Sequence, residues 1–323
     1  MKKIVLSSVL VENPDIESAL IGERGYELIF IPNSDDDTFL DKIKFADAVI
    51  TADKQITKEM IDTMENCQII VRQGIGFDSI DLKAARQKGI VVCNIPDYCV
   101  EEVADYTVGM ILAATRHITT YNQHVHEGIW DINSVHKVSG FPPIRRLSTQ
   151  TVGIVGFGRI ARLIASRLRP FGANLITYDP YIDSKIAEEN GAKLVGFDEL
   201  VKTADIMTLN LPLTEETYHM FDKDAFEKMK ETAFVINTGR GPLINEKDLD
   251  YALRNGLIAG ASIDVTESEP LTLDSPLLEL KNLVITPHAA FFSHDSFIEL
   301  REKAAAEAMG VLDGEAPKNP VNL

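Results

Sequence analysis

Three side chains in the C-terminal half of the sequence are of types that together can reduce a ketone beside a carboxylate: Arg240, Glu269 and His288. A guanidinium can hold a carboxylate through charge-assisted hydrogen bonds and polarise the neighbouring ketone. An imidazolium can supply a proton as hydride reaches the carbonyl carbon, and can take it back in the oxidation. A carboxylate next to that ring favours its charged form. The trio is chemically sufficient for reversible reduction of a 2-oxo acid.

The positions of these residues along the chain favour one shared site. Taken singly, Arg240 is equally well read as a phosphate clamp, Glu269 as a surface acid and His288 as a helix cap. Each of them, however, comes shortly after a predicted strand. These strands are 234–237, 261–264 and 283–286. Because ligands of an open parallel sheet bind outside the carboxyl ends of its strands, we expect the three segments to converge in one cleft.

A glycine-rich turn predicts the source of the hydride. Gly156, Gly158 and Ala161 form a GxGxxA pattern between a predicted strand at 151–155 and an amphipathic helix at 160–168. The first glycine permits the tight turn, the second lets the backbone approach a pyrophosphate, and the small third residue lets helix and strand pack closely. The N–H groups at the start of the helix, at Arg159 and Ile160, are expected to hold the phosphates.

Asp179 predicts which dinucleotide is bound. It stands at the end of the next predicted strand, 23 residues after Gly156, close to the position of the acid that holds the adenosine ribose. Its carboxylate would repel a 2′-phosphate and no arginine follows it within 180–183, so NAD is favoured over NADP. The alternative is that Asp179 only starts a turn before Pro180.

Two series of alternating strands and helices position these residues. Apolar, β-rich runs in the first series lie at 3–7, 27–31, 48–51, 68–72 and 91–95, and in the second at 151–155, 175–178, 206–209, 234–237, 261–264 and 283–286. This alternation is typical of βαβ units with a parallel sheet. The fold class predicted is α/β, with a flavodoxin-like domain and a doubly wound, Rossmann-like domain on either side of a cleft.

Helical patterns are expected to join the two series. One runs from Val100 through Arg116 and on to His126, and the irregular segment 128–148, which contains the single tryptophan, Trp130, follows it. The last helical pattern, 296–312, has no strand of its own and is expected to return to the first domain.

Composition limits the possible partners and the compartment. The 323 residues carry a net charge of −17, which argues against nucleic acid and anionic membranes as partners and requires a local positive pocket for any anionic ligand. Three cysteines without a CxxC pair, no signal-peptide cleavage site and no apolar run of membrane length predict a cytoplasmic protein. The seven histidines show no ligand spacing, so no metal is expected.

Several motifs together resemble the D-isomer-specific 2-hydroxyacid dehydrogenase family, which includes phosphoglycerate dehydrogenases and hydroxypyruvate reductases. The chain is most similar to the branch with the C-terminal-binding-protein corepressors. Besides the glycine turn, the motifs are VRQGIGFDSID at 71–81, VEEVADYT at 100–107, NTGRG at 237–241, ESEP at 267–270 and TPHAA at 286–290. The resemblance implies that Arg240, Glu269 rather than Glu267, and His288 are catalytic.

The resemblance also implies binding residues and an assembly. The substrate carboxylate would meet Arg72, Gly74, Ile75 and Gly76. NAD would meet Thr107, Gly156, Gly158, Arg159, Ile160, Asp179, Leu211, Pro212, Thr217, Thr238, Gly239, Arg240, Asp264, His288 and Ala290. The implied domains are a discontinuous substrate-binding domain, 1–99 with 291–323, and an NAD-binding domain, 100–290. An arm near 117–148 would form a homodimer.

The chain departs from the family pattern at three places. Asp78 is followed by Ser79 instead of asparagine, Gly239 replaces the usual alanine before Arg240, and Phe291 stands where the corepressor branch has tryptophan. Phe291 and Phe292 are read either as part of the substrate pocket or as plain core at the domain junction. The resemblance leaves two functions open: an NAD-dependent dehydrogenase acting on a small 2-oxo or 2-hydroxy acid, and an NAD(H)-sensing, corepressor-like binding protein with little turnover.

Overall fold

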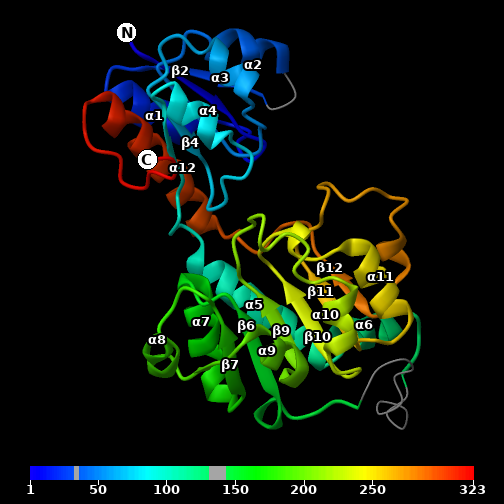
Figure 1. Cartoon of the computed structure of the whole chain (residues 1–323). Coiled ribbons are helices and arrows are strands. Elements are labelled where there is room, and N and C mark those ends of the chain that lie inside the picture. The colour runs from blue at the N-terminus through cyan, green and yellow to red at the C-terminus, as the bar shows by residue number, and fades with distance from the viewer. Residues whose placement is uncertain (33–35, 131–142) are drawn as a thin grey trace. The chain divides into compact units, whose positions relative to one another are not determined.

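The computed structural model of the protein describes residues 1–32, 36–130 and 143–323. It divides into two compact units, the first formed by Met1–Cys99 with Phe292–Leu323 and the second by Val100–Phe291. Each unit has a parallel sheet with helices packed against it (Figure 1). The predicted α/β fold class is therefore confirmed.

The first unit contains a sheet with the strand order β2-β1-β3-β4-β5, and all of its neighbouring strands are parallel. Its strands are β1 (Lys3–Ser7), β2 (Glu27–Ile31), β3 (Ala48–Thr51), β4 (Ile69–Arg72) and β5 (Val91–Cys93). The order is that of flavodoxin-like folds. Its helices are α1 (Asp15–Glu23), α2 (Asp36–Ile43), α3 (Lys58–Thr63), α4 (Leu82–Gln87) and the last helix of the chain, α12 (His294–Leu312).

The second unit contains a larger parallel sheet, in the order β12-β11-β10-β9-β6-β7-β8. Its strands are β6 (Thr151–Val155), β7 (Asn174–Tyr178), β8 (Lys193–Leu194), β9 (Ile206–Leu209), β10 (Phe234–Asn237), β11 (Gly260–Ile263) and β12 (Leu283–Ile285). The six strands of this unit that come first along the chain, β6 to β11, follow the doubly wound order, and the strand order reverses between β6 and β9. The prediction of six strands missed β8, because two residues at a sheet edge leave no alternating pattern to detect.

Helices cover both faces of this second sheet. The helices of this unit are α5 (Val100–Thr115), α6 (Ile118–His126), α7 (Arg159–Leu168), α8 (Ser184–Glu189), α9 (Phe197–Thr203), α10 (Lys223–Lys228) and α11 (Glu246–Arg254). The 3₁₀ turns in the described residues of this unit are η1 (Leu147–Thr149), η2 (Arg169–Phe171), η3 (Gly241–Leu243) and η4 (Pro276–Glu279).

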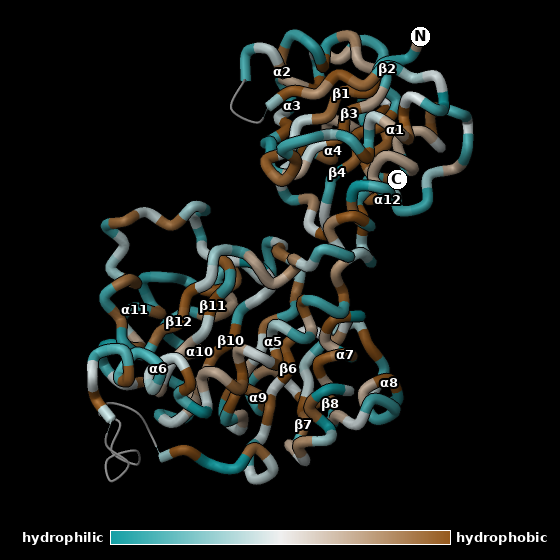
Figure 2. The backbone as a smooth tube through the Cα atoms, turned by 180° about the vertical axis from the view of Figure 1, so that it is seen from behind, coloured by the Kyte–Doolittle hydropathy of each residue, from teal (hydrophilic) through white to brown (hydrophobic). Residues whose placement is uncertain are grey.

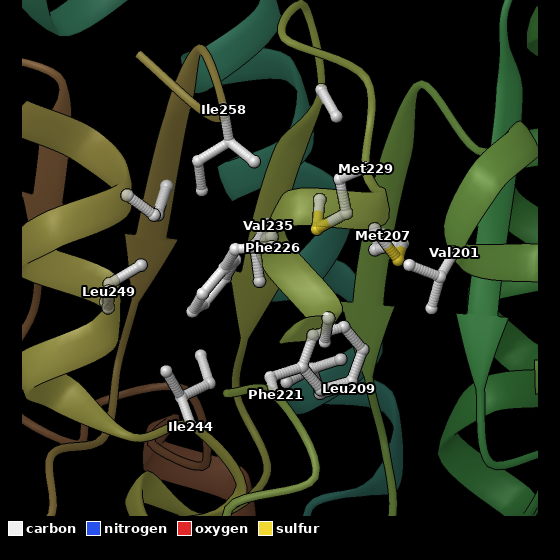
Figure 3. Packing of buried hydrophobic residues seen from close by; sticks show 14 of the residues in the cluster. Val201, Met207, Leu209, Phe221, Phe226, Met229, Val235, Ile244, Leu249 and Ile258 are labelled. Atoms are coloured by element: carbon white, nitrogen blue, oxygen red, sulfur yellow. The ribbon is translucent and has the colours of Figure 1, made fainter. Parts of the chain in front are cut away.

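Alternating side chains of the strands fill two cores, one on each face of the second sheet. On one face, Val152 and Ile154 of β6 pack with residues of α5 and α7. On the other, Val235 of β10 and Leu209 of β9 belong to a core with α9, α10 and α11, whose centre includes Phe226 (Figure 3). The strands of both sheets stand out as the apolar centre of each unit in Figure 2. Rigid strands of this kind fix where the loops at their carboxyl ends begin.

The expected single helix from Val100 to His126 is wrong, because the chain turns at His117. This residue has left-handed backbone angles, φ 52° and ψ 35°, and separates α5 from α6. Its ring is buried, 6.3 Å from the ring of Phe234 and 6.4 Å from that of Tyr121. Glycine and proline, the residues that usually mark a helix end, are absent around His117, so no local pattern signals the break. Part of the predicted arm, residues 131–142, lies outside the described residues.

Candidate active site

The loops after three neighbouring strands of the second unit carry the predicted trio. β10, β11 and β12 pair in parallel, with Asn237 opposite Ile263 and Ile263 opposite Ile285. Their carboxyl ends therefore meet at one edge of the sheet, and Arg240, Glu269 and His288 follow from that edge.

Glu269 and His288 are in direct contact. Glu269 Oε2 lies 2.7 Å from His288 Nδ1, and each side chain is about 40% exposed, 39% and 41% respectively. The Thr266 N–H donates to the other carboxylate oxygen over 3.2 Å. Because a carboxylate accepts, Nδ1 carries a hydrogen and points it at Glu269, which leaves Nε2 as the ring nitrogen that can exchange a proton with a substrate.

The surroundings of Glu269 favour its ionised form. Burial raises the pKa of this carboxyl, but the hydrogen bond and charge of His288, the Thr266 N–H and the charge of Arg240 together bring the pKa below its ordinary value. Glu269 is therefore a carboxylate throughout the neutral range, as its pairing with an imidazolium requires.

Asp264 holds the loop that carries His288. Its side chain is 1% exposed, and its carboxylate accepts hydrogen bonds from Thr286 Oγ1 at 2.6 Å and from the N–H groups of Ala289 and Ala290 at 2.9 Å each. Its backbone carbonyl accepts from the His288 N–H at 2.7 Å. His288 has φ 52°, a left-handed conformation that a non-glycine residue adopts only when its neighbours enforce it. Sequence reasoning missed this role, since it depends on contacts across 22 to 26 residues of chain.

Arg240 is placed by its own turn and by a close approach of two backbones. The buried Asn237 side chain donates to the Arg240 carbonyl at 2.8 Å and accepts from the Gly239 N–H at 3.0 Å, so the flexible Gly239 is braced. Directly after Arg240, a Cβ on Gly241 would lie 1.9 Å from the carbonyl oxygen of Thr266. Only glycine fits at this position, and the loop of Arg240 is thereby pressed against the loop of Glu269.

The glycine turn has the geometry of a pyrophosphate site. Gly156 has φ 82°, and a Cβ there would lie 2.8 Å from the Asn210 carbonyl oxygen. α7 begins after Gly158 without a side-chain cap, so its first N–H groups remain for a ligand. Asp179, which directly follows β7, accepts a hydrogen bond from the Phe157 N–H at 2.8 Å and so lies beside the turn. These features fit a dinucleotide at the reversal of strand order between β6 and β9.

The other predicted NAD contacts lie around the same sheet edge. Thr107 of α5 is buried, and its Oγ1 lies 2.8 Å from Oγ1 of Thr238. Thr217 folds back on its own loop, where its hydroxyl donates to the Pro212 carbonyl at 2.7 Å. Leu211, like Pro212, belongs to the loop after β9, and Ala290 is buried in the loop held by Asp264.

The predicted substrate contacts Arg72, Gly74, Ile75 and Gly76 lie in the first unit, at the end of β4. Arg72 donates to the Gln73 carbonyl at 2.5 Å. Gly74 has φ 147°, and a Cβ there would fall 1.4 Å from an Arg72 guanidinium nitrogen. The guanidinium therefore lies against the backbone of the Gly74 turn, and the positive φ of Gly74 favours glycine at this position.

The two phenylalanines after the histidine motif differ from each other. The ring of Phe291 stands edge-on to the His288 ring, with 6.1 Å between centroids, whereas Phe292 is 61% exposed. Plain core is therefore the wrong reading for Phe292, and Phe291 borders the candidate site.

The described part of the chain contains neither a metal-ligand cluster nor a helix of membrane length and apolarity. No group of three or more His, Cys, Asp or Glu side chains there is arranged to hold a metal ion. None of the described helices combines the length and the apolar character needed to cross a membrane.

Comparison with known proteins identifies the family. Residues 108–290, more than half of the chain, match the NAD binding domain of the D-isomer specific 2-hydroxyacid dehydrogenases. A D-3-phosphoglycerate dehydrogenase of Methanocaldococcus jannaschii is 37% identical over 98% of this chain, but the match spans only 59% of that longer protein. A glyoxylate reductase of Korarchaeum cryptofilum is 35% identical over 88% of this chain and 85% of its own length.

A solved structure agrees with these matches. The D-lactate dehydrogenase of Aquifex aeolicus, complexed with NAD and lactic acid, covers 99% of both chains with a TM-score of 0.87 and 27% identity. The chain therefore belongs to the D-isomer specific 2-hydroxyacid dehydrogenase family, and residues 108–290 form its NAD-binding domain.

Proposed function

We propose that the protein is an NAD-dependent dehydrogenase that interconverts a small D-2-hydroxy acid and the corresponding 2-oxo acid. The observation that carries this proposal is the 2.7 Å pair of Glu269 and His288 on the sheet edge that also presents Arg240, within the unit that holds the NAD-binding domain. Relatives that reduce glyoxylate or oxidise phosphoglycerate carry names of this reaction class.

Each residue of the trio has a separate task in the proposed reaction. NADH, when bound, would supply the hydride that reaches the carbonyl carbon of the substrate. His288 gives the proton on Nε2 to the carbonyl oxygen, and takes it back in the oxidation. Glu269 stabilises the imidazolium and fixes which nitrogen faces the substrate. Arg240 binds the substrate carboxylate and draws electron density from the ketone.

We assign substrate binding to the first unit and cofactor binding to the second. The boundaries proposed from the sequence, 1–99 with 291–323 and 100–290, differ from those of the two units only at Phe291. The family match at 108–290 supports the second assignment, because it leaves the remaining residues to supply the rest of the substrate site. Arg72 and the Gly74–Gly76 backbone are the groups in the first unit suited to a carboxylate.

A panel of 2-oxo acids with both reduced cofactors tests the function. We expect NADH oxidation with glyoxylate or hydroxypyruvate, and a kcat/KM with NADPH at least about tenfold lower, because Asp179 repels the 2′-phosphate. Absorbance at the nicotinamide band measures turnover, and quenching of protein fluorescence measures NADH binding. If NADH binds but no acid of the panel, large apolar ones included, is reduced, the proposed activity is wrong.

We also propose a homodimer in the cytoplasm, formed through α6 and the residues that follow it. Within the described residues α6 has no buried side chain, and the exposed apolar side chains on and after it include Val125, Ile129 and the 82%-exposed Trp130. A dimer interface would bury this strip.

Light scattering with size-exclusion chromatography tests the dimer. The wild type is expected at twice the chain mass of 35.8 kDa. Trp130→Ser should weaken association about 30-fold, the effect of losing an aromatic anchor of roughly 2 kcal/mol. The control is Tyr181→Ser, which removes a 91%-exposed aromatic residue from another surface and should leave the mass unchanged. A monomeric wild type at every concentration would exclude the dimer.

A further inference from the structure

A second histidine and two more acids lie beside the loops of the candidate site. We call this group the His219 cluster and define it as His219, Asn245, Glu246 and Glu267. His219 follows β9, Asn245 and Glu246 open α11 after β10, and Glu267 follows β11. Their contacts therefore join three successive loops of the sheet edge that carries Arg240 and Glu269.

Glu246 and Glu267 hold each other's backbone. The Glu246 N–H donates to Glu267 Oε1 at 2.8 Å, and the Glu267 N–H donates to Glu246 Oε1 at 2.5 Å. This reciprocal pair attaches the loop of Glu269 to the first residue of α11. Helix α11 is itself anchored, since Leu249, Ala252 and Leu253 are buried in the core. The loop is thus tied to a rigid element two residues before Glu269.

His219 approaches the same carboxylate oxygen of Glu267. Asn245 Oδ1 accepts from the N–H groups of Lys247 and Asp248 at 3.1 and 3.2 Å, so its Nδ2 is the atom that faces His219 Nδ1, 3.3 Å away. An amide nitrogen only donates, so Nδ1 accepts and the ring hydrogen sits on Nε2. This nitrogen lies 3.2 Å from Glu267 Oε1, a close polar contact that is not aligned for a strict hydrogen bond.

The ring of His219 is held in this direction by its own neighbours. It stacks on Tyr218 with 3.9 Å between centroids and 22° between planes. The backbone of His219 has φ 51°, and its N–H donates to the Pro242 carbonyl at 2.8 Å, within the turn that begins at Gly241. The cluster is thereby linked to the turn of Arg240 as well as to that of Glu269.

The carboxylates of the His219 cluster also interact electrostatically with Glu269. Burial raises the pKa of Glu246, the Glu267 N–H lowers it, and the negative charges of Glu267 and Glu269 raise it again. Glu267 and Glu269 therefore act on the same neighbour, although only Glu269 contacts His288. The two acids of the ESEP motif therefore have different contacts: Glu269 contacts His288, and Glu267 contacts the start of α11.

We infer that Glu267 is a positioning residue: through Glu246 and His219 it fixes the loop 264–270 so that Glu269 reaches His288. The inference rests on the proposed dehydrogenase function, and it gives the His219 cluster a task in that reaction without contact with substrate or cofactor. A small displacement of Glu269 would break its 2.7 Å contact with His288, and displacements of about 1 Å can cost roughly 100-fold in rate.

Magnetic resonance of the intact protein, labelled isotopically in histidine, tests the inference without depending on turnover. The ring signal of His288 is assigned by its loss in His288→Gln. In Glu267→Ala this signal should move from the wild-type position toward its position in Glu269→Gln. In Glu267→Gln it should stay, since the amide oxygen still accepts from the Glu246 N–H. Glu231→Ala, which removes an exposed acid, is the control.

Kinetics give the second readout. Glu267→Ala should lower kcat about tenfold with unchanged NADH binding, and Glu267→Ala with Glu269→Gln should be no slower than Glu269→Gln alone, because both changes act through one contact. Should Glu267→Ala fail to fold, Glu246→Ala removes the other half of the reciprocal pair and carries the same expectation. A His288 signal that stays at its wild-type position in these variants overturns the inference, whereas an inactive wild type contradicts only the proposed function.

Discussion

Replacing His288 with glutamine is expected to lower kcat by about 100-fold to 10,000-fold, the range that general acid–base catalysis contributes. Glutamine can still hydrogen-bond to Glu269, but its amide cannot release a proton from the position of Nε2. NADH affinity should stay within about twofold of the wild type, because the expected contacts to the phosphates and ribose, at the turn of Gly156 and at Asp179, are unchanged in this variant. Fluorescence titration and stopped-flow turnover measure the two quantities separately.

The pH dependence of the wild type should show the loss of the Glu269 carboxylate on the acid side of the profile. The pKa of Glu269 lies below its ordinary value, so its carboxylate is lost only as the pH falls through the acid range. Because this pKa is lower in the folded than in the unfolded chain, the ionised carboxylate stabilises the fold above the unfolded value, and that contribution is lost as the pH falls through the folded value. Loss of reductase activity at alkaline pH must therefore come from a group other than Glu269, because that carboxyl is already ionised there.

The matched control for His288→Gln is His126→Gln, which changes an exposed histidine of α6. It should leave both kcat and NADH affinity unchanged. Retained turnover in His288→Gln would mean that the proton donor is another group, and weakened NADH binding would mean that His288 acts mainly through the cofactor.

Most of the fold follows from local patterns in the sequence. Strands such as Ile206–Leu209 and Phe234–Asn237 are short, buried and β-rich, and their bounds match the predicted ranges because both faces of a parallel sheet are covered. The parallel arrangement in turn predicts that loops after neighbouring strands meet, and Arg240, Glu269 and His288 do follow the successive strands β10, β11 and β12 at one sheet edge.

Features set by long-range contacts could not be predicted. His117 adopts a left-handed conformation because its ring is buried against Phe234, more than a hundred residues away in the chain. Asp264 and Glu267 are acids after a strand like many others, and only the fold shows that one holds the His288 loop and the other the start of α11. A loop has no periodicity from which side-chain direction can be read. Two acids, Glu267 and Glu269, were therefore candidates for the partner of His288, and the resemblance to the family indicated Glu269.

The second large effect concerns the ion pair that fastens the C-terminal helix to the first unit. Arg301 of α12 donates to both carboxylate oxygens of Glu17 on α1, at 2.9 and 2.6 Å, and also to Asp15 and to the Asn13 carbonyl. Glu17 is fully buried and Arg301 is 9% exposed. Removing one partner of such a pair leaves a charge in an apolar environment, which costs about 3–5 kcal/mol.

Arg301→Met is therefore expected to lower the free energy of unfolding by about 3–5 kcal/mol, measured by urea denaturation followed by circular dichroism. Adding Glu17→Gln should restore part of the loss, since the double variant has no unpaired buried charge. The control is Arg24→Met, which breaks an exposed pair with Asp313 and should cost less than about 1 kcal/mol.

Comparing Arg301→Met with Arg24→Met distinguishes two contributions to the attachment of α12, the buried ion pair and the apolar face of the helix. The helix also buries Leu300, Ala304, Ala305, Ala308 and Leu312, so its apolar face alone contributes to the core. If Arg301→Met were no more destabilising than Arg24→Met, the apolar face would be sufficient and the ion pair would serve only to set the register of α12 on α1. A loss that Glu17→Gln repairs would instead show that the buried Glu17 charge, not the packing of α12, decides the stability of this contact.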